Sequence, residues 1–322
     1  MKLLVLGGTK FLGRHVVEAA LERGHDVTIF HRGETNRGLF GDHVEEVLGD
    51  RDGGLGALES GHWDAVVDTS GYFPRVVGAS AKLLAERADH YTFISSISVY
   101  DDFSTGPHEG SPLRRLEDET IEEMGDEYQY YGGLKALCER TVERAFPGRT
   151  LVVRPGLIVG PHDPTDRFTY WAERLARGGE ILAPGPPERL VQFVDVRDLA
   201  AWIVRLVEER RSAVFNATSQ GVSWGELLAG AEVTWVSDGF LVEHGVGEWI
   251  ELPLWIADPE WVGMLQADVS RAVAAGLRVR PVAETVRDTA EWAATRSEHE
   301  PEAGLAPERE RELLETWRGR RS

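Results

Sequence analysis

The fold is decided near the start of the chain, by Leu3-Leu4-Val5-Leu6-Gly7-Gly8-Thr9-Lys10-Phe11-Leu12-Gly13. Leu3 to Leu6 is a continuous apolar run, which is typical of a strand buried on both faces. Apolar residues then recur at helical spacing, so the glycines lie between a strand and a helix. Free amides at the start of such a helix bind a pyrophosphate. The segment predicts a dinucleotide site whose contacts are Gly7, Thr9, Lys10, Phe11, Leu12 and Gly13.

Short apolar strands and helical segments alternate through the first half of the chain. After Leu3 to Leu6, strands are expected at Val27–Phe30, Val44–Leu48, Ala65–Asp68, Tyr91–Ser95 and Leu151–Arg154. Helices are expected at Phe11–Arg23, Val76–Ala88 and Leu134–Phe146. Because apolar strands that alternate with helices form a parallel sheet covered on both faces, the pattern predicts a doubly wound (Rossmann) α/β domain.

The pattern changes after Pro161, where prolines interrupt the chain before an expected strand at Val191–Val194 and a helix at Asp198–Glu208. Nine of the ten tryptophans follow position 166, which favours a separate, smaller C-terminal lobe. We expect residues 1–165 and 190–220 to form the NAD(P)-binding Rossmann domain. Residues 166–189 and 221–322 would form a substrate-binding lobe that ends in a surface helix from Pro307 to Arg318.

The amino-acid composition limits the kinds of partner that the chain is expected to bind. The formal net charge of −19 repels phosphate backbones and anionic lipids, so we expect neither nucleic acid nor membrane as a partner. Cys138 is the only cysteine, cannot pair within the chain and reads as a small buried apolar residue. With no signal-like start and no apolar run of about 18 residues, a cytoplasmic location is expected. The histidines show no metal-ligand spacing, so no metal is expected.

The cofactor's adenosine half is predicted to meet residues at the ends of three strands. His31 and Arg32 stand where an acidic residue would select NAD, which favours NADP over NAD, although a solvated Arg32 would leave the pocket open to either cofactor. Asp50, with Arg51 beside it, could accept from the adenine amino group or could instead cap a helix start. Ser70 and Gly71 would run beside the cofactor or serve only as a turn.

The most specific constellation is Ser96 with Tyr131 and Lys135. Tyrosine and lysine four residues apart lie on one helix face, so the ammonium can approach the phenol. A neighbouring cation stabilises a phenolate and lowers the tyrosine pKa from about 10 towards neutrality. Together with the glycine turn, the three residues predict acid-base chemistry by Tyr131.

In these motifs the chain resembles the extended short-chain dehydrogenase/reductases, within the NAD-dependent epimerase/dehydratase group. Further matching segments are Gly49-Asp50-Arg51-Asp52, Ser95 to Tyr100, Tyr131 to Lys135, Arg154 to Pro161 and Phe193 to Ala200. The resemblance implies that Ser96 polarises the substrate oxygen and that Pro155, Gly156, Leu157 and Ile158 border the nicotinamide. It also implies a homodimer formed through the helices at Val76–Ala88 and Tyr131–Phe146.

Departures from the family pattern restrict the activity. Ile97 and Ser98 stand where related dehydratases carry acidic residues, and Val191 stands where many nucleotide-sugar epimerases carry an arginine. Lys10 within the glycine turn is similar to an atypical branch that includes isoflavone-reductase-like proteins and RNA-binding chloroplast proteins. Because Ser96, Tyr131 and Lys135 are all present, we expect this branch to be enzymatic here.

The function expected is therefore NADP-preferring hydride transfer to or from a carbonyl or secondary alcohol, on a small-molecule substrate. His162, Arg167 and Gln192 are candidate substrate contacts, with His162 alternatively a hydrogen-bonding group of its loop. One alternative is an epimerase that retains NAD. Another, from a different class, is a non-catalytic cofactor-sensing or RNA-binding protein.

Overall fold

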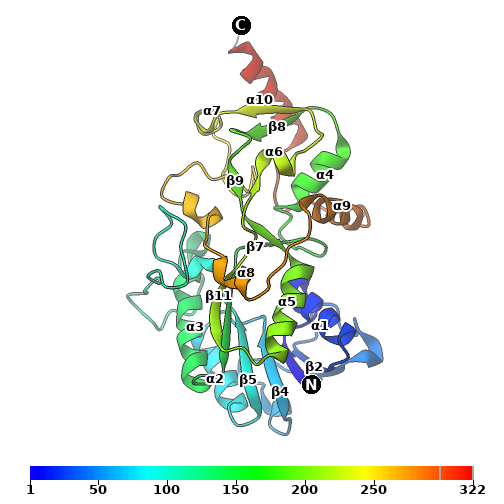
Figure 1. Cartoon of the computed structure of the whole chain (residues 1–322), viewed down its shortest axis with the longest axis vertical. Helices are drawn as coiled ribbons and strands as arrows, with labels where there is room; N and C mark the ends of the chain where they lie inside the picture. The colour runs from blue at the N-terminus through cyan, green and yellow to red at the C-terminus, as the bar shows by residue number, and fades with distance from the viewer. Residues whose placement is uncertain (297–298, 321–322) are drawn as a thin grey trace.

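The computed structural model describes residues 1–296 and 299–320 of the chain. Its lower half in Figure 1 is built on a seven-stranded sheet whose neighbouring strands are all parallel. The spatial order is β11 (Ala213–Ala217), β6 (Thr150–Pro155), β5 (Ala88–Ile94), β4 (Trp63–Asp68), β1 (Lys2–Leu6), β2 (Asp26–His31) and β3 (Glu45–Leu48). The chain winds outward from β1 to β3 and then crosses to β4, so the strand order reverses between β1 and β4.

Two layers of helices cover this sheet. Helices α1 (Phe11–Glu22) and α5 (Val196–Glu208) pack together on one face, and α2 (Pro74–Leu84) and α3 (Tyr131–Ala145) on the other (Figure 1). Successive β1 side chains serve opposite faces, because Leu3 belongs to the α1/α5 core and Leu4 to the α2/α3 core. The predicted doubly wound α/β fold is confirmed.

A second apolar core lies at the other end of the molecule, in the upper half of Figure 1. It gathers Trp171, Trp224 and Trp255, which are fully buried, around the parallel pair β8 (Ile181–Pro184) and β13 (Val233–Val236). The other short strands are β7 (Leu157–Val159) paired with β10 (Phe193–Asp195), and β9 (Leu190–Val191) paired with β12 (Val222–Ser223). The remaining α-helices of the chain are α4 (Thr169–Arg177), α6 (Trp224–Leu227), α7 (Asp238–Glu243), α8 (Ser270–Ala274), α9 (Val282–Ala293) and α10 (Pro307–Gly319). Of these, α8 packs on β11 of the main sheet.

Several sequence predictions were wrong in their bounds: α3 (Tyr131–Ala145) and β5 each begin three residues earlier than expected, and three further differences have a visible cause. The expected strand Val191–Val194 is two strands, β9 and β10, which pair with different partners on either side of Gln192. The expected helix Val76–Ala88 ends at Leu84, because Ala88 already pairs with Trp63 as the first residue of β5. Helix α5 begins two residues earlier than expected, where the Asp195 carboxylate accepts the Arg197 amide.

The terminal helix lies on the surface, as predicted, and buries one face. Leu313 and Leu314 of α10 are buried in the C-terminal core, and Glu310 is buried in an ion pair with Arg174 of α4. Cys138 is buried, as predicted. Within residues 1–296 and 299–320, no helix combines the length and the apolar character needed to cross a bilayer.

Candidate functional site

The glycine turn after β1 is held in a shape that side chains would prevent. Gly7 and Gly8 have φ angles of +105° and +94°. A Cβ on Gly13 would lie 2.7 Å from the Gly8 nitrogen, so the first turn of α1 packs directly on the glycine backbone. No side chain of the described residues caps this helix start, and its first turn carries no acidic residue. Its amides lie just past the carboxyl end of β1, where the strand order reverses towards β4 and where an anionic group can bind them.

The remaining residues of this turn divide into buried and exposed positions. Leu12 and Thr9 are buried, and the Thr9 carbonyl accepts a hydrogen bond from the side-chain Nδ2 of Asn36 at 2.9 Å. Lys10 is exposed at the N-cap position of α1, and Phe11 follows it with φ of +39°. Asn36, which was not predicted, ties the loop after β2 to the glycine turn.

His31 and Arg32 lie at the carboxyl end of β2, as predicted. The His31 Nε2 lies 2.7 Å from Glu46 Oε1, and its Nδ1 accepts the Gly33 amide at 3.1 Å. Arg32 is exposed and pairs with Glu34 at 2.9 Å. His31 and Arg32 therefore each already have a carboxylate partner, and Arg32 is the one that solvent reaches.

Asp50 and Arg51 follow β3 but differ in environment. The Asp50 carboxylate accepts the Asp52 amide in a turn, so it caps no helix. Arg51 turns inward and forms a bidentate ion pair with the fully buried Asp68 at 2.7 and 2.8 Å. Tyr91 donates to the same carboxylate at 2.8 Å. Arg51 thus belongs to an internal network with Asp68 and Tyr91. These two residues were not predicted as part of the site, although a carboxylate at the end of an apolar strand is a recognisable sequence signal.

Ser70 and Gly71 follow β4 and connect this network to the rest of the site. Ser70 Oγ donates to the Leu6 carbonyl at 3.2 Å, which ties the ends of β4 and β1 together. The Gly71 carbonyl accepts a 2.7 Å hydrogen bond from Lys135 Nζ. A Cβ on Gly71 would lie 2.5 Å from the Phe93 ring, so the turn requires glycine.

Ser96 and Tyr131 are brought together by the contact between α3 and the short 3₁₀ turn Ile97–Val99. A Cβ on Gly132 would lie 2.0 Å from the Ser98 carbonyl oxygen, so glycine allows the start of α3 to rest on this turn. Burial raises the Tyr131 pKa to about 12, against the lowering effects of a Ser96 hydrogen bond and the Arg167 charge. A tyrosine that keeps its proton suits the role of acid better than that of resting base.

Lys135 does not act as its spacing from Tyr131 suggested. Its ammonium donates to the Gly71 and Ile94 carbonyls at 2.7 and 2.6 Å and lies 4.4 Å from the centre of the Phe93 ring. Burial lowers its pKa to about 8. The cation with the larger effect on Tyr131 is Arg167, because the Lys135 chain turns towards the strand ends. The expected lowering of the Tyr131 pKa towards neutrality was therefore wrong.

Pro155 to Ile158 carry the chain from the main sheet to the second half of the molecule. Pro155 ends β6, and the Gly156 amide donates to the Ala217 carbonyl at 3.2 Å. Leu157 packs into the C-terminal core, whereas Ile158 packs against the α1/α5 core. The segment follows β6 at the same sheet edge as Ser96 and the glycine turn.

Of the three candidate substrate contacts, Arg167 is the one whose charge reaches Tyr131. His162 packs against α1, with Nδ1 3.3 Å from Arg14 and its ring 5.4 Å from that of Trp292. The Gln192 amide donates to the Ser219 and Ala267 carbonyls, both at 3.0 Å, and accepts the Ala267 amide at 2.7 Å. Gln192 therefore ties segments of the fold together.

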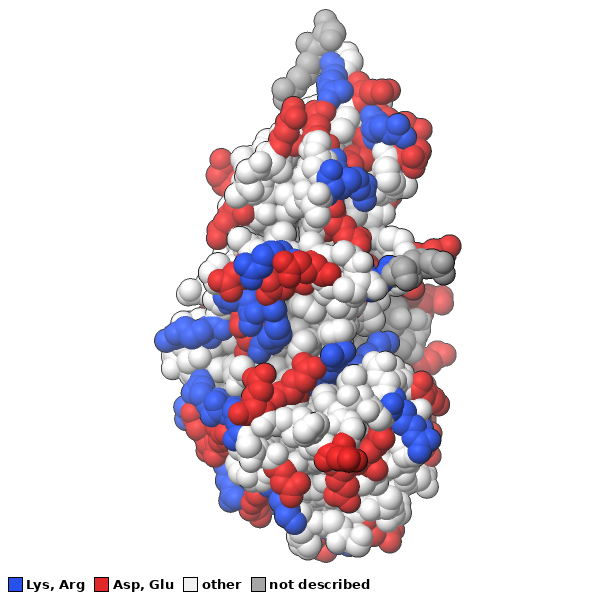
Figure 2. Space-filling model, turned by 90° about the vertical axis from the view of Figure 1, so that its right-hand side faces the viewer, with Lys and Arg blue, Asp and Glu red and all other residues white. Residues whose placement is uncertain are grey.

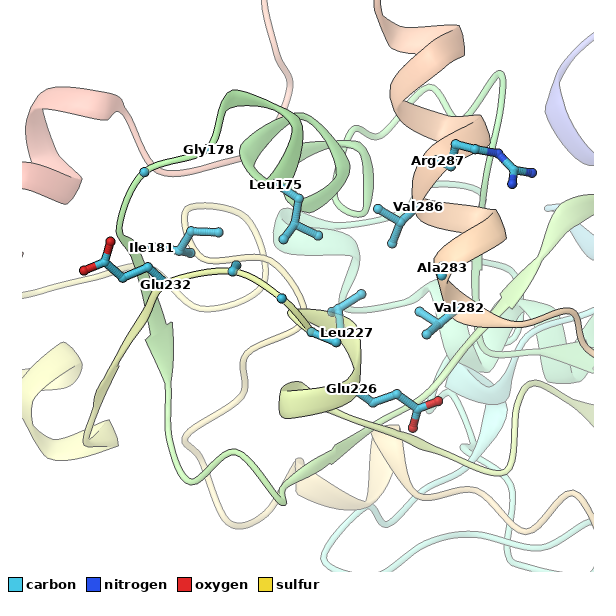
Figure 3. Close-up of a pocket in the computed structure, with 14 residues that line it drawn as sticks. Leu175, Gly178, Ile181, Glu226, Leu227, Glu232, Val282, Ala283, Val286 and Arg287 are labelled. Carbon is cyan, nitrogen blue, oxygen red and sulfur yellow. The ribbon is translucent and has the colours of Figure 1, made fainter.

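A pocket in the C-terminal half lies apart from these residues. Leu175 of α4, Leu227 of α6 and Val286 of α9 point into it, and Arg287 points away from it (Figure 3). None of the predicted site residues lines it. Among residues 1–296 and 299–320, no three His, Cys, Asp or Glu side chains gather as metal ligands.

Comparison with known proteins gives one family. The NAD dependent epimerase/dehydratase family matches residues 3–217. A curated relative, the chloroplast stem-loop binding protein of 41 kDa b from Arabidopsis thaliana, is 24% identical over 238 residues, which cover 68% of this chain. The chain spans about three fifths (59%) of that relative's length.

Solved structures share the fold at low identity. The Bordetella bronchiseptica enzyme WbmH in complex with NAD+ is 18% identical, with a TM-score of 0.61 and coverage of 91% of this chain and 98% of that one. UDP-glucuronic acid 4-epimerase from Bacillus cereus, in complex with NAD, is 15% identical, with a TM-score of 0.62 and coverage of 92% and 99%. A likeness at these identities establishes the fold alone.

Proposed function

Because the chain belongs to the NAD dependent epimerase/dehydratase family, we propose that it is a nicotinamide-dependent oxidoreductase acting on a carbonyl or secondary alcohol. The observation that carries the proposal is the contact of Gly132 with the Ser98 carbonyl, which sets Tyr131 beside Ser96. A phenol that stays protonated beside a serine hydroxyl can donate a proton to a carbonyl oxygen as that oxygen gains charge.

The protein fits the dinucleotide that the family implies. The uncapped amides of Phe11, Leu12 and Gly13 would hold the pyrophosphate. The Gly71 and Ile94 carbonyls use two of the three N–H groups of Lys135, and the third would donate to the nicotinamide ribose, as the family resemblance implies. When bound, the nicotinamide supplies or accepts a hydride. Ser96 donates a hydrogen bond to the substrate oxygen, and Tyr131 gives that oxygen its proton.

Replacing Tyr131 by phenylalanine tests the mechanism. We expect Tyr131→Phe to lower turnover by about 10² to 10⁴ while the dissociation constant for the cofactor stays the same. Oxidation of NADPH with a panel of small aldehydes and ketones, together with cofactor titration, measures both quantities. The matched control is Tyr128→Phe, since Tyr128 is 71% exposed. Full turnover by Tyr131→Phe would refute the proposed acid.

We further propose that NADP is preferred over NAD. Arg32 is exposed just past the end of β2, where the adenine ribose 2′ position is recognised, and Glu34 and Glu46 are already paired with Arg32 and His31. Arg32→Gln is expected to weaken NADPH binding and to leave NADH binding unchanged. Equal weakening of both cofactors would contradict the preference.

The second candidate function is an epimerase that retains NAD, which the similarity to the Bacillus cereus UDP-glucuronic acid 4-epimerase in complex with NAD favours. Denaturing the freshly purified protein separates the two functions: stoichiometric NAD released into solution supports the epimerase, and NADPH turnover by cofactor-free protein supports the reductase.

A homodimer through α2 and α3 is also proposed, and light scattering on the eluting protein tests it. From the exposed Lys10 in the glycine turn we also propose that the chain belongs to the isoflavone-reductase-like branch.

A further inference from the structure

Arg167 lies in the loop between β7 and α4 and is held in place by its own loop. Its Nε donates to Thr165 Oγ1 at 3.3 Å, and the same hydroxyl donates to Asp163 Oδ1 at 2.8 Å. Its guanidinium lies 5.1 Å from the centre of the Trp249 ring. Asp163 is fully buried, so the relay that orients Arg167 is anchored inside the protein.

Arg167 differs from the other enclosed arginines in what it meets. Arg154, Arg174 and Arg51 each form a close ion pair with a carboxylate, at 2.6 to 2.8 Å. Arg167 has no carboxylate within 4.0 Å among residues 1–296 and 299–320, and only its Nε has a hydrogen-bond partner there. Burial lowers its pKa, and the groups that act against this are Asp163 and Tyr131.

Arg167 is half-buried, so its guanidinium loses part of its hydration with no carboxylate to compensate, and an anionic ligand would supply that partner. The planar fork of terminal nitrogens matches a carboxylate or a phosphate group in a bidentate arrangement. The Trp249 ring beneath the fork restricts its orientation. The charge of Arg167 also lowers the Tyr131 pKa, which links a group bound at the fork to the proposed acid.

We propose that Arg167 binds an anionic group of the substrate, a carboxylate or a phosphate, and so holds the reacting carbon at Tyr131. This proposal rests on the proposed function and names its substrate class. The substrate would be a carbonyl compound or secondary alcohol that carries an acidic group within one side chain's reach of the reacting carbon.

Three probes that share one ring test the proposal: benzoate, phenyl phosphate and benzyl alcohol. We expect at least one of the two anions to bind the wild-type protein about tenfold or more tightly than benzyl alcohol, by calorimetry in phosphate-free buffer. Arg167→Gln should abolish that difference, and Arg167→Lys should retain part of it because lysine keeps the charge without the fork. The control is Arg177→Gln, on the exposed end of α4. Preference for benzoate identifies a carboxylate, and preference for phenyl phosphate identifies a phosphate ester.

The same titrations distinguish this proposal from the proposed function. Each protein is measured with and without NADPH. A failure to bind NADPH counts against the proposed oxidoreductase. The anion affinities measured without cofactor still test the role of Arg167. Anion binding by Arg167→Gln at wild-type strength would overturn the proposal. So would wild-type protein that binds benzyl alcohol as tightly as both anions. If Arg167→Gln does not fold, the proposal is tested by comparing the anion affinities of the wild-type protein and Arg167→Lys.

Discussion

At the scale of single residues, the cation that acts on Tyr131 lies far away in the sequence, although burial, Tyr72 and Ser96 have larger effects on the tyrosine pKa. Lys135 is four residues from Tyr131 on the same helix, yet its ammonium is bound to the Gly71 and Ile94 carbonyls. Arg167 is 36 positions further along the chain than Tyr131 and is the cation that lowers the tyrosine pKa against burial. Spacing on a helix shows which residues share a face, whereas the acceptors that a long side chain finds depend on the folded neighbours.

His162 predicts a defined loss of stability in acid. Burial, with Arg14 and His15 beside it, lowers its pKa to about 4, whereas a histidine in the unfolded chain titrates near 6.5. The unfolded state therefore binds more protons between these values, and stability falls as the pH falls from about 6.5 towards 4. We expect His162→Gln to lose less stability than wild type across this window, measured by urea unfolding at several pH values.

The groups facing His162 allow a separate check of this prediction. Glu18, which lies beside it on α1, has a pKa lowered to about 2, so its own contribution is lost only at lower pH, from about 4.5 downwards. His43→Gln, at an exposed position, serves as the control. Identical pH profiles for wild type and His162→Gln would contradict the assignment.

At the scale of the elements, the placement of α3 depends on a missing side chain. Gly132→Ala would bring a Cβ to 2.0 Å from the Ser98 carbonyl oxygen, so the start of α3 would have to move away from the turn that carries Ser96. Alanine itself favours a helix by about 0.5 to 1 kcal/mol over glycine. We expect Gly132→Ala to lower turnover severely, with helical content by circular dichroism unchanged.

The control for this substitution is Gly239→Ala in α7, where an added Cβ meets no atom within 4 Å. That variant is expected to keep its turnover and to gain about 0.5 to 1 kcal/mol in stability. Turnover by Gly132→Ala equal to that of Gly239→Ala would mean that the contact with Ser98 does not position Tyr131.

The elements also show what sequence patterns can and cannot predict. The strand Leu3–Leu6 and the glycine turn were predictable, because burial on both faces and the positive φ of Gly7 leave few other residues possible. Val191–Val194 reads as one apolar strand, but Gln192 bonds to the distant Ala267 and the chain changes partner there. The inward orientation of the Arg51 side chain towards Asp68 was equally unpredictable from the sequence, because an arginine that follows a strand is usually solvated. Patterns report local burial, and long-range pairing decides the rest.

At the scale of the whole molecule, the last helix is fastened to the C-terminal core by a buried ion pair. Glu310 and Arg174 are each 6% exposed, and the same carboxylate accepts the Leu182 amide at 3.0 Å. Removing one partner of a buried pair leaves an uncompensated charge, so Glu310→Ala should cost about 3 to 5 kcal/mol. Glu308→Ala, in the exposed pair with Arg311 on the same helix, should cost at most about 1 kcal/mol. Equal denaturation midpoints for the two variants would show that α10 is not held by this pair.

The charge of the whole molecule separates the enzymatic proposal from RNA binding, which the similarity to the Arabidopsis stem-loop binding protein raises. The chain has 54 acidic against 35 basic side chains, and on the face in Figure 2 the two kinds are interspersed over both halves. Binding to a phosphate backbone depends on lysines and arginines that displace counterions, and an excess of carboxylates opposes it.

We therefore expect a labelled RNA stem-loop to bind more weakly than about 10⁻⁴ M at physiological salt, measured by fluorescence anisotropy. NADPH, titrated into the same protein and followed by its own fluorescence, shows that the preparation is competent to bind phosphates. RNA binding that is tight at this salt and is lost in Lys10→Gln and Arg32→Gln would place RNA in the dinucleotide crevice and reverse the proposal. Tight binding that survives both substitutions would instead require a basic surface elsewhere, and the alternation of charge in Figure 2 argues against one on that face.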